Sequence, residues 1–336
     1  MALLARVADR ILWGARYVER AEDSARIIRS YGDLLVDLPA RLASGWEPLL
    51  ALTGNHQHGL GGEHDIVEYL VADPDNPGSI RSTVARAREN LRTTREVVPR
   101  EGWYTLNSLW QYVESEAERA VGRRTRDRFL GRVIEESRRL DGVLESTMTR
   151  SDPFWMWRLG RLIERADMTT RVVGVRAATL LELQRRGTGV AEQYPEVQWM
   201  GALRSVSALQ MYQRAVSGPI EGPDVVRFLL FHEQFPRSVR ACLDEIRVLL
   251  GRLPGPDSVL EHLGAVDTVL LSCDLVTDDG AALDAAMDGV QAAIAALNEA
   301  IASQYLSIDP EAITSSPGAR GCDGGSSPAS DGETTA

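Results

Sequence analysis

One charged pattern occurs twice in the chain: residues 16–26 read Arg-Tyr-Val-Glu-Arg-Ala-Glu-Asp-Ser-Ala-Arg, and residues 161–171 read Arg-Leu-Ile-Glu-Arg-Ala-Asp-Met-Thr-Thr-Arg. Both copies fit Arg-x-x-Glu-Arg-Ala-acid-x-hydroxyl-x-Arg at a constant offset of 145 residues. The charged positions lie three, four and seven residues apart, which places them along one side of a helix. The repeat indicates two equivalent halves, each led by a helix that carries one copy.

Apolar residues surround both copies at heptad spacing. In the first copy they form two series three residues apart, the pattern of a helix that buries one stripe. This pattern predicts one long helix from about Ala2 to Leu38, ended by Pro39. The second copy has the same phase and predicts a long helix over 153–186. The first-copy series are Leu4, Ile11, Val18 and Ala25 with Val7, Gly14, Ala21 and Ile28, and the second-copy stripe is Leu159, Ile163, Ala166, Val173, Ala177 and Leu180.

Helical patterns fill most of the remaining chain. Asn76-Pro77 and Asp152-Pro153 are each an N-cap residue followed by proline, and they predict helix starts at 77 and 153. No alternating β-branched stretch with hairpin turn residues occurs. We therefore expect an all-α fold: a single large multi-helix body of two pseudo-repeated halves, about 1–150 and 151–306, and a disordered tail over 307–336. The other expected helices are 46–53, 64–72, 77–97, 103–121, 124–149, 196–216, 223–232, 236–252, 256–275 and 280–304.

The chain contains no lysine, so all 37 of its cationic side chains are arginine. P-loop NTPases need a lysine on the phosphates, and pyridoxal enzymes and Schiff-base aldolases need a lysine amine. Protein kinases need a strand lysine. The sequence also lacks the Glu-x-x-His of di-metal bundles and the Gly-x-Ser-x-Gly of hydrolases. These classes are excluded, no catalytic residue is assigned, and we expect no cofactor.

The net charge of −11 is concentrated at one end of the chain. Residues 251–314 hold eleven acids and one arginine, whereas residues 1–250 hold 34 acids and 35 arginines. Within the near-neutral part, residues 81–139 hold 14 arginines and nine acids. Such a stretch could bind a polyanion, but interleaved acids and few accompanying aromatics argue against it. We expect no nucleic-acid partner.

The repeated Arg/Glu motifs have three interpretations. The simplest is a solvated stripe of ion pairs within one helix. The charged positions recur while the apolar neighbours vary, Tyr17 against Leu162, which favours a buried arginine–carboxylate network that joins the two long helices. An anion-binding groove is the third interpretation. A related cluster lies at 87–92, where Asn90, like Asn107 further on, needs a polar partner inside a helix. The candidate binding or structural network is Arg16, Glu19, Arg20, Arg26, Arg88, Glu89, Asn90, Arg161, Glu164, Arg165 and Arg171.

Histidine and cysteine give no clear site. His56, His58 and His64 flank a glycine-rich segment, but their spacing fits no established zinc pattern, so we expect no metal. Cys242 and Cys273 lie in apolar helical patterns, which predicts small buried thiols.

Several features indicate a cytoplasmic protein. The first 13 residues carry Arg6, Asp9 and Arg10 inside an apolar stretch, so they lack the apolar core of a secretion signal. No run approaches the roughly 20 apolar residues of a membrane span. Three cysteines are too few for a disulfide framework. We expect no membrane association.

Several motifs, in order along the chain, resemble those of the bacterial alpha-E domain family, and the resemblance covers about residues 1–306. The family usually has glycine before the first motif arginine, whereas this chain has Ala15 there and Gly14 one position earlier. The matching segments are Leu-Trp-Gly-Ala-Arg-Tyr-Val-Glu-Arg-Ala-Glu at 12–22, Asn-Pro-Gly-Ser-Ile at 76–80, Ala-Arg-Glu-Asn at 87–90, Trp-Arg-Leu-Gly-Arg at 157–161, Glu-Arg-Ala-Asp at 164–167, Phe-Leu-Leu at 228–230 and Phe-Pro-Arg-Ser-Val at 235–239.

The resemblance implies an all-helical fold without a firmly assigned activity. Members of the family typically occur beside, or fused to, circularly permuted ATP-grasp proteins and transglutaminase-like proteins. This implies an accessory or interaction subunit of an ATP-grasp-type amide- or peptide-bond-forming system rather than a stand-alone enzyme. The alternative is an enzyme whose repeated motifs bind an anionic substrate, with Glu19 or Glu164 as acid or base at a shifted pKa.

Overall fold

The computed structural model of the chain describes residues 3–38, 45–52, 59–185, 195–273 and 280–306. All regular structure in these ranges is helical, without a strand, so the expected all-α class is confirmed. The helices are α1 Ala5–Asp37, α2 Pro48–Leu52, α3 Gly62–Val71, α4 Ile80–Arg92, α5 Arg100–Ala120, α6 Arg123–Thr147, α7 Asp152–Arg185, α8 Pro195–Ser205, α9 Leu209–Ala215, α10 Gly222–Phe231, α11 Val239–Leu250, α12 Asp257–Leu271 and α13 Gly280–Ile301, and a π-helical turn, Ala302–Leu306, follows α13.

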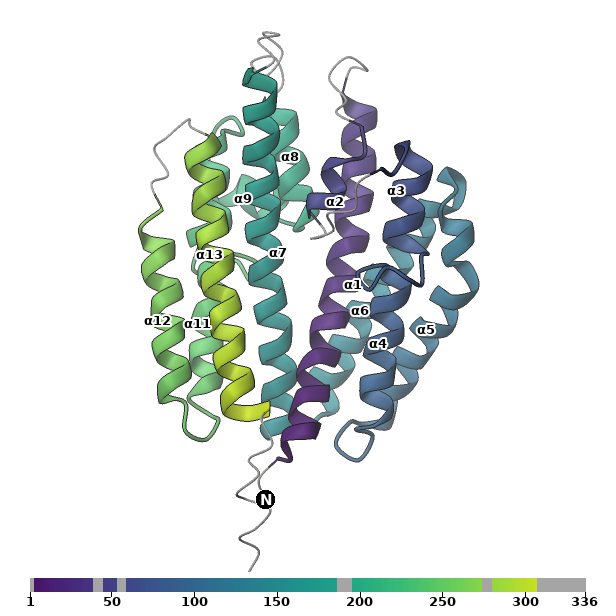
Figure 1. Ribbon diagram of the computed structural model, residues 1–336, viewed down its shortest axis with the longest axis vertical. Coiled ribbons are helices and arrows are strands. Elements are labelled where there is room, and N and C mark those ends of the chain that lie inside the picture. Colours follow the sequence, from purple (N-terminus) through teal and green to yellow (C-terminus); the bar gives the residue numbers. More distant parts are fainter. Residues whose placement is uncertain (1–2, 39–44, 53–58, 186–194, 274–279, 307–336) are drawn as a thin grey trace, which may run out of the picture.

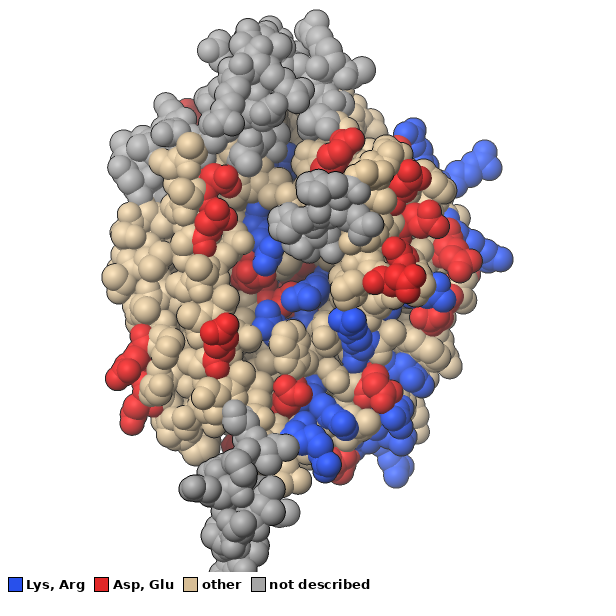
Figure 2. All heavy atoms as spheres, viewed as in Figure 1, with Lys and Arg blue, Asp and Glu red and all other residues tan. Residues whose placement is uncertain are grey.

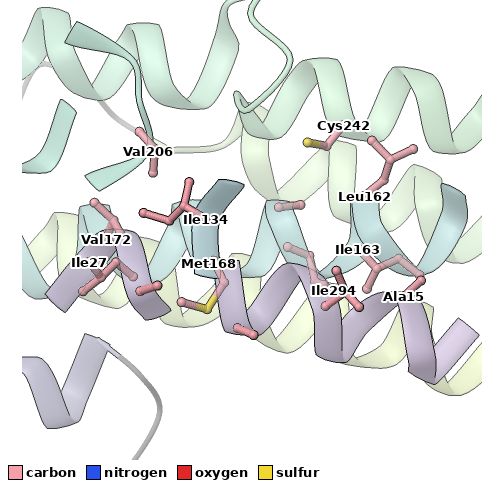
Figure 3. Close-up of a cluster of buried hydrophobic side chains, with 14 of the residues drawn as sticks. Ala15, Ile27, Ile134, Leu162, Ile163, Met168, Val172, Val206, Cys242 and Ile294 are labelled. Carbon is pink, nitrogen blue, oxygen red and sulfur yellow. The ribbon is translucent and has the colours of Figure 1, made fainter. Parts of the chain in front are cut away.

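Two long helices, α1 and α7, form the centre of the molecule and run in the same direction (Figure 1). Helices α4, α6, α7 and α8 pack around α1, while α11 and α13 pack on α7. Because neighbours surround α1, its charged side is buried as well as its apolar stripe. Figure 3 shows Ala15 and Ile27 of α1 with Ile163 and Val172 of α7 among the apolar side chains of this core.

The two central helices face each other in register, residue against residue 145 positions later. Near one end, a Cβ added to Gly160 would collide with the carbonyl oxygen of Leu12 and lie 3.1 Å from the Cβ of Ala15. Near the other end, the guanidinium of Arg176 lies over the ring of Tyr31, 5.6 Å from its centroid. The absence of a side chain at Gly160 therefore lets the two backbones approach closely.

The exchange of glycine and alanine at positions 14 and 15 now has a structural explanation. Ala15 faces α7, where Gly160 supplies the space. Gly14 faces α4 instead, because a Cβ there would lie 2.6 Å from Cδ1 of Leu91. Each of the two adjacent small residues thus admits a different neighbouring helix.

Several expected helix boundaries are wrong: α4 ends at Arg92 rather than 97, α5 begins at Arg100 rather than 103, α11 begins at Val239 rather than 236, and α12 ends at Leu271 rather than 275. Helix α4 begins at Ile80 rather than 77, because Ser79 is the N-cap and its hydroxyl accepts a hydrogen bond from the Ser82 amide at 3.1 Å. The side chain of Asn76 accepts from the amide of Gly78 at 2.9 Å and so stabilises the preceding turn.

The expected helix over 196–216 is divided into α8 and α9. Ser207 has φ of 54°, in the left-handed region. The amide of Ala208 donates to the carbonyl of Leu203 at 2.7 Å, and the amide of Ser207 donates to that of Arg204 at 3.0 Å. These bonds form a Schellman-type helix end, which here uses serine in place of the usual glycine.

Some expectations fall on residues outside the described ranges: the tail over 307–336, His56, His58 and Cys322. Among the described helices, none combines the length and apolar character needed to cross a bilayer. The division into halves at residue 150 stays a prediction.

Replacing Gly160 with alanine tests the close approach of α1 and α7. Although alanine is the better helix former by about 1 kcal/mol, the added methyl group should lower the free energy of unfolding by about 1–3 kcal/mol. Urea denaturation measures the change. Gly142 in α6 provides the control, because a Cβ there meets nothing within 4 Å and Gly142→Ala should stabilise the protein. Equal effects of both substitutions would contradict the close approach.

Candidate functional site

The glutamate of the second motif copy binds arginines of the first copy. Glu164 has no exposed surface. Its Oε2 accepts from Nε of Arg16 at 2.9 Å, and its Oε1 accepts from Nε of Arg20 at 2.5 Å. Both bonds cross from α1 to α7. The carboxylate is therefore a link between the two central helices.

The glutamate of the first copy makes the reciprocal bonds. Glu19 is also fully buried. Its Oε2 accepts from Nε of Arg161 at 2.5 Å, and its Oε1 accepts from Nε of Arg165 at 2.9 Å. A third cation, Arg237, lies 3.1 Å from Oε1. The first and second arginines of each motif copy thus bind the glutamate of the other copy.

Further charged side chains lie around Glu19 on its side of the α1–α7 pair. Oε2 of Glu22 accepts from Arg161 at 3.0 Å, and Oε1 of Glu22 accepts from Arg26 at 2.5 Å. Arg138 of α6 also donates to Glu22, and Arg237 donates to Asp23. We name this group the Glu19 cluster: Glu19, Glu22, Asp23, Arg26, Arg138, Arg161, Arg165 and Arg237.

The side that holds Glu164 carries fewer groups. Asp167, which occupies the same motif position as Glu22, accepts from Nε of Arg171 at 2.8 Å. Nη1 of Arg16 donates to Oδ1 of Asn298 in α13 at 2.6 Å. We name this group the Glu164 cluster: Arg16, Arg20, Glu164, Asp167 and Arg171.

The buried arginines keep both motif glutamates ionised. Burial alone would raise the pKa of Glu19, but Arg161, Arg165 and Arg237 outweigh it and hold the pKa well below its usual range. Arg20 and Arg16 likewise outweigh burial and lower the pKa of Glu164. A carboxylate with a lowered pKa is a poor proton acceptor at neutral pH. This opposes the use of either glutamate as a general base.

Asp23 behaves in the opposite way. Burial raises its pKa to about 6; Arg237 and Arg26 lower the pKa, whereas Glu19 and Glu22 raise it further. Among the described residues, its Oδ2 has no hydrogen-bond partner. That oxygen is the place at which Asp23 accepts a proton.

The cluster at 87–92 does not join the network. Nε of Arg88 donates to Oδ1 of Asn107 at 2.8 Å, and the guanidinium lies 4.0 Å from the ring centroid of Trp110. Glu89 is exposed and pairs with Arg92 one turn later in α4. Asn90 lies beside Gly14, with its Cβ 3.5 Å from the position of an added Cβ. Its backbone oxygen accepts the hydroxyls of the two following threonines.

Sequence reasoning missed Arg237 and Arg138 as members of the site. Arg237 lies in the loop between α10 and α11, where the Thr169 hydroxyl donates to its carbonyl oxygen at 2.9 Å. Arg138 is one of many surface arginines of α6. The Phe-Pro-Arg-Ser-Val segment was visible as a motif, but only its neighbour in space, Asp23, reveals what its arginine binds.

The remaining candidates within the described ranges are His64, Cys242 and Cys273. His64 is exposed, with Nε2 3.9 Å from Glu68. No group of three or more metal-binding side chains lies together in the described ranges. Cys242 is buried as expected, and burial raises its pKa to about 12. Cys273 is only half-buried, against expectation, although burial raises its pKa too.

Residues 3–306 match a family model named Alpha-E, which is described as a predicted alpha-helical domain with a conserved ER motif. The chain belongs to the Alpha-E family. In this Alpha-E protein, both Glu-Arg pairs of the repeated motif, Glu19-Arg20 and Glu164-Arg165, lie at the contact between α1 and α7. No solved structure matches the chain.

Similar proteins include the uncharacterized protein Mb2597 of Mycobacterium bovis and the uncharacterized proteins MT2643 and Rv2567 of Mycobacterium tuberculosis. Each is 24% identical over 277 residues, a match that covers 74% of this chain and 30% of the relative. The matched region therefore makes up less than a third of these relatives.

Neutralising either motif glutamate should destabilise the fold. Glu19→Gln removes a buried negative charge that three arginines share, and although Arg161 and Arg237 keep other carboxylates, Arg165 loses its only described carboxylate partner. The change should cost about 3–5 kcal/mol of unfolding free energy. Glu164→Gln should cost less, because it binds two arginines rather than three. Glu89→Gln, at an exposed ion pair, is the control and should change urea denaturation little. Unchanged stability in Glu19→Gln would contradict a structural role.

The raised pKa of Asp23 predicts a specific pH dependence. An unfolded aspartate has a pKa of about 3.9, so the folded state binds this proton more tightly and gains stability from Asp23 as the pH falls from about 7 to about 4. Asp23→Asn removes this contribution. Its unfolding free energy relative to wild type should therefore be higher at pH 7.5 than at pH 5. Parallel pH profiles of the two proteins would contradict the raised pKa.

Proposed function

We propose that this Alpha-E protein is a cytoplasmic accessory subunit that binds an ATP-grasp-type ligase in an amide- or peptide-bond-forming system. A transglutaminase-like protein is the second partner in this proposal. The motif resemblance motivates both partners. The protein would act as a rigid helical body beside the enzyme rather than carry out the chemistry.

The observation that supports this role most is the burial of the motif glutamates. Glu19 and Glu164 lie in the contact between two helices, and neither has exposed surface. Lowered pKa values make them poor proton acceptors. A substrate could reach neither carboxylate without separating α1 from α7. The motif that suggests catalysis from the sequence is therefore better explained as a structural link.

Two further observations agree with a role beside another protein. The matched region makes up 30% of each mycobacterial relative, so in those proteins a similar segment belongs to a longer chain. The chain also lacks the lysine on which ATP-dependent enzymes commonly rely for phosphate binding. Nucleotide chemistry in such a system is therefore assigned to the partner.

The acidic end of the chain offers a surface for such a partner. Helices α12 and α13 expose carboxylates at Asp257, Glu261, Asp288 and Glu299. A negative surface speeds association with a positively charged partner and makes it sensitive to salt.

Co-purification with a circularly permuted ATP-grasp-type protein of the same organism tests the proposal. We expect a complex at micromolar concentration whose affinity falls with added salt. Glu261→Arg should weaken the complex, because it reverses one exposed charge of α12. Glu89→Arg, at an exposed acid of α4, is the matched control and should bind as the wild type does. Failure of the two wild-type proteins to associate would refute the proposed partner.

A further inference from the structure

The Glu164 cluster differs from the Glu19 cluster in its access to solvent. The side chains of Arg20 and Arg171 are each 29% exposed, and that of Arg16 is 10% exposed. Figure 2 shows charged side chains of both signs in a hollow between α7 and α1. By contrast, the motif arginines of the Glu19 cluster are 4% exposed at Arg161, 5% at Arg26 and 16% at Arg165. Only Arg138 of α6, among the members of that cluster, is largely exposed, at 53%. A solute can therefore reach the arginines of the Glu164 cluster.

The exposed arginines have donor groups to spare. Arg20 and Arg171 bind their carboxylates through Nε alone, and Arg16 adds one bond from Nη1 to Asn298. Within the described residues, the terminal amino groups of Arg20 and Arg171 and Nη2 of Arg16 have no hydrogen-bond partner. Five terminal nitrogens of the three guanidinium groups are thus available around the hollow.

The corresponding arginine of the Glu19 cluster has a carboxylate oxygen close to each of its three nitrogens, although its Nη1 makes only an ion-pair contact and no hydrogen bond among the described residues. Arg161, at the motif position of Arg16, binds Glu19 through Nε and Glu22 through Nη2. Its Nη1 lies 2.5 Å from Oδ1 of Asp141. The guanidinium of Arg161 is therefore surrounded by carboxylates on every donor edge.

One substitution between the motif copies accounts for part of this difference. Glu22 of the first copy binds both Arg26 and Arg161, whereas Asp167 of the second copy binds Arg171 and makes no ion pair with Arg16 among the described contacts. Aspartate is one methylene shorter than glutamate. Beside Arg16, no carboxylate of the described residues occupies the position that the Glu22 carboxylate occupies beside Arg161.

We propose that the Glu164 cluster binds the carboxylate group of a ligand at this place, between Arg16, Arg20 and Arg171. A carboxylate is the anion that occupies the matching place in the Glu19 cluster, and guanidinium groups bind carboxylates in pairs of parallel hydrogen bonds. The cluster holds three arginines and two carboxylates, so one further negative charge balances it. The ligand is a small carboxylate or the carboxyl end of a longer molecule that enters through the hollow.

The proposed carboxylate site is independent of the proposed ligase partner. It involves residues of α1 and α7 alone, and it can be measured on the isolated chain. Loss of carboxylate binding and loss of ligase binding are separate results. The site equally serves an accessory subunit that holds an acidic substrate or an enzyme of another kind.

Calorimetric titration of the full chain with glutarate tests the site. We expect saturable binding with a millimolar or tighter Kd, at an ionic strength held constant with sodium chloride. Arg20→Gln should weaken binding at least about tenfold, because a hydrogen bond to a charged group contributes about 1.5–3 kcal/mol. Arg92→Gln, at an exposed arginine of α4, is the control and should bind as the wild type does.

Asp167→Glu is the decisive variant. The longer side chain should reach Arg16 and take the ligand's place, as Glu22 does beside Arg161. We expect glutarate binding to weaken at least about tenfold while the thermal unfolding midpoint stays the same or rises, which separates occupation of the site from unfolding.

Three results would overturn the proposal. The first is the absence of saturable binding above that seen with chloride alone. The second is unchanged glutarate affinity in Asp167→Glu. The third is tight binding of inorganic phosphate, titrated in the same way, without binding of glutarate, because the site would then select a phosphate group rather than a carboxylate.

Discussion

Two buried glutamates on two parallel helices, each bound by the arginines of the other helix, determine how this molecule is assembled. An apolar stripe repeated every seven residues allows one helix to slide along another by a heptad with little loss of buried area. The charges do not allow this, because a shift would leave ionised carboxylates and guanidinium groups buried without partners. The network therefore fixes the axial position of α7 on α1, and the glycine at 160 fixes their distance. Seven of the described outer helices pack directly on this pair (α2, α4, α6, α8, α10, α11 and α13), and α3, α5, α9 and α12 pack on those helices in turn.

The two sides of the central pair share a backbone arrangement but differ in how completely their charges are paired. On the Glu19 side, arginines from α6 and from the loop before α11 supplement those of the motif. On the Glu164 side, the described contacts of the cluster include no such addition, and the acid is shorter by one methylene. The Glu19 cluster is thus largely internal apart from Arg138, whereas the Glu164 cluster keeps Arg20 and Arg171 partly exposed. A repeated sequence can in this way give a structural site and a binding site on opposite sides of one helix pair.

Much of the fold follows from local patterns, and the rest depends on contacts between distant residues. The heptad stripes predict α1 and α7 closely, and the repeated motif indicates which side of each helix carries the charges. The sequence pattern alone does not indicate that each glutamate binds the arginines of the other copy, since ion pairs one turn apart within a single helix fit the same spacing. The helix break at Ser207 and the cap at Ser79 depend on turn geometry that serine allows but does not require. Arg237 belongs to the site only because its loop is held against α7.

The register of the central helices has a consequence for folding and for dissecting the chain. The partners of Glu19 lie more than 140 residues away in sequence, so its burial becomes favourable only after α7 has been made and has docked. Until α7 has been synthesised, the charged side of α1 in the nascent chain must stay hydrated or be bound by another molecule. The boundary between the two motif-bearing halves is therefore a poor place to cut the gene, because each half contains the counter-ions that the other needs.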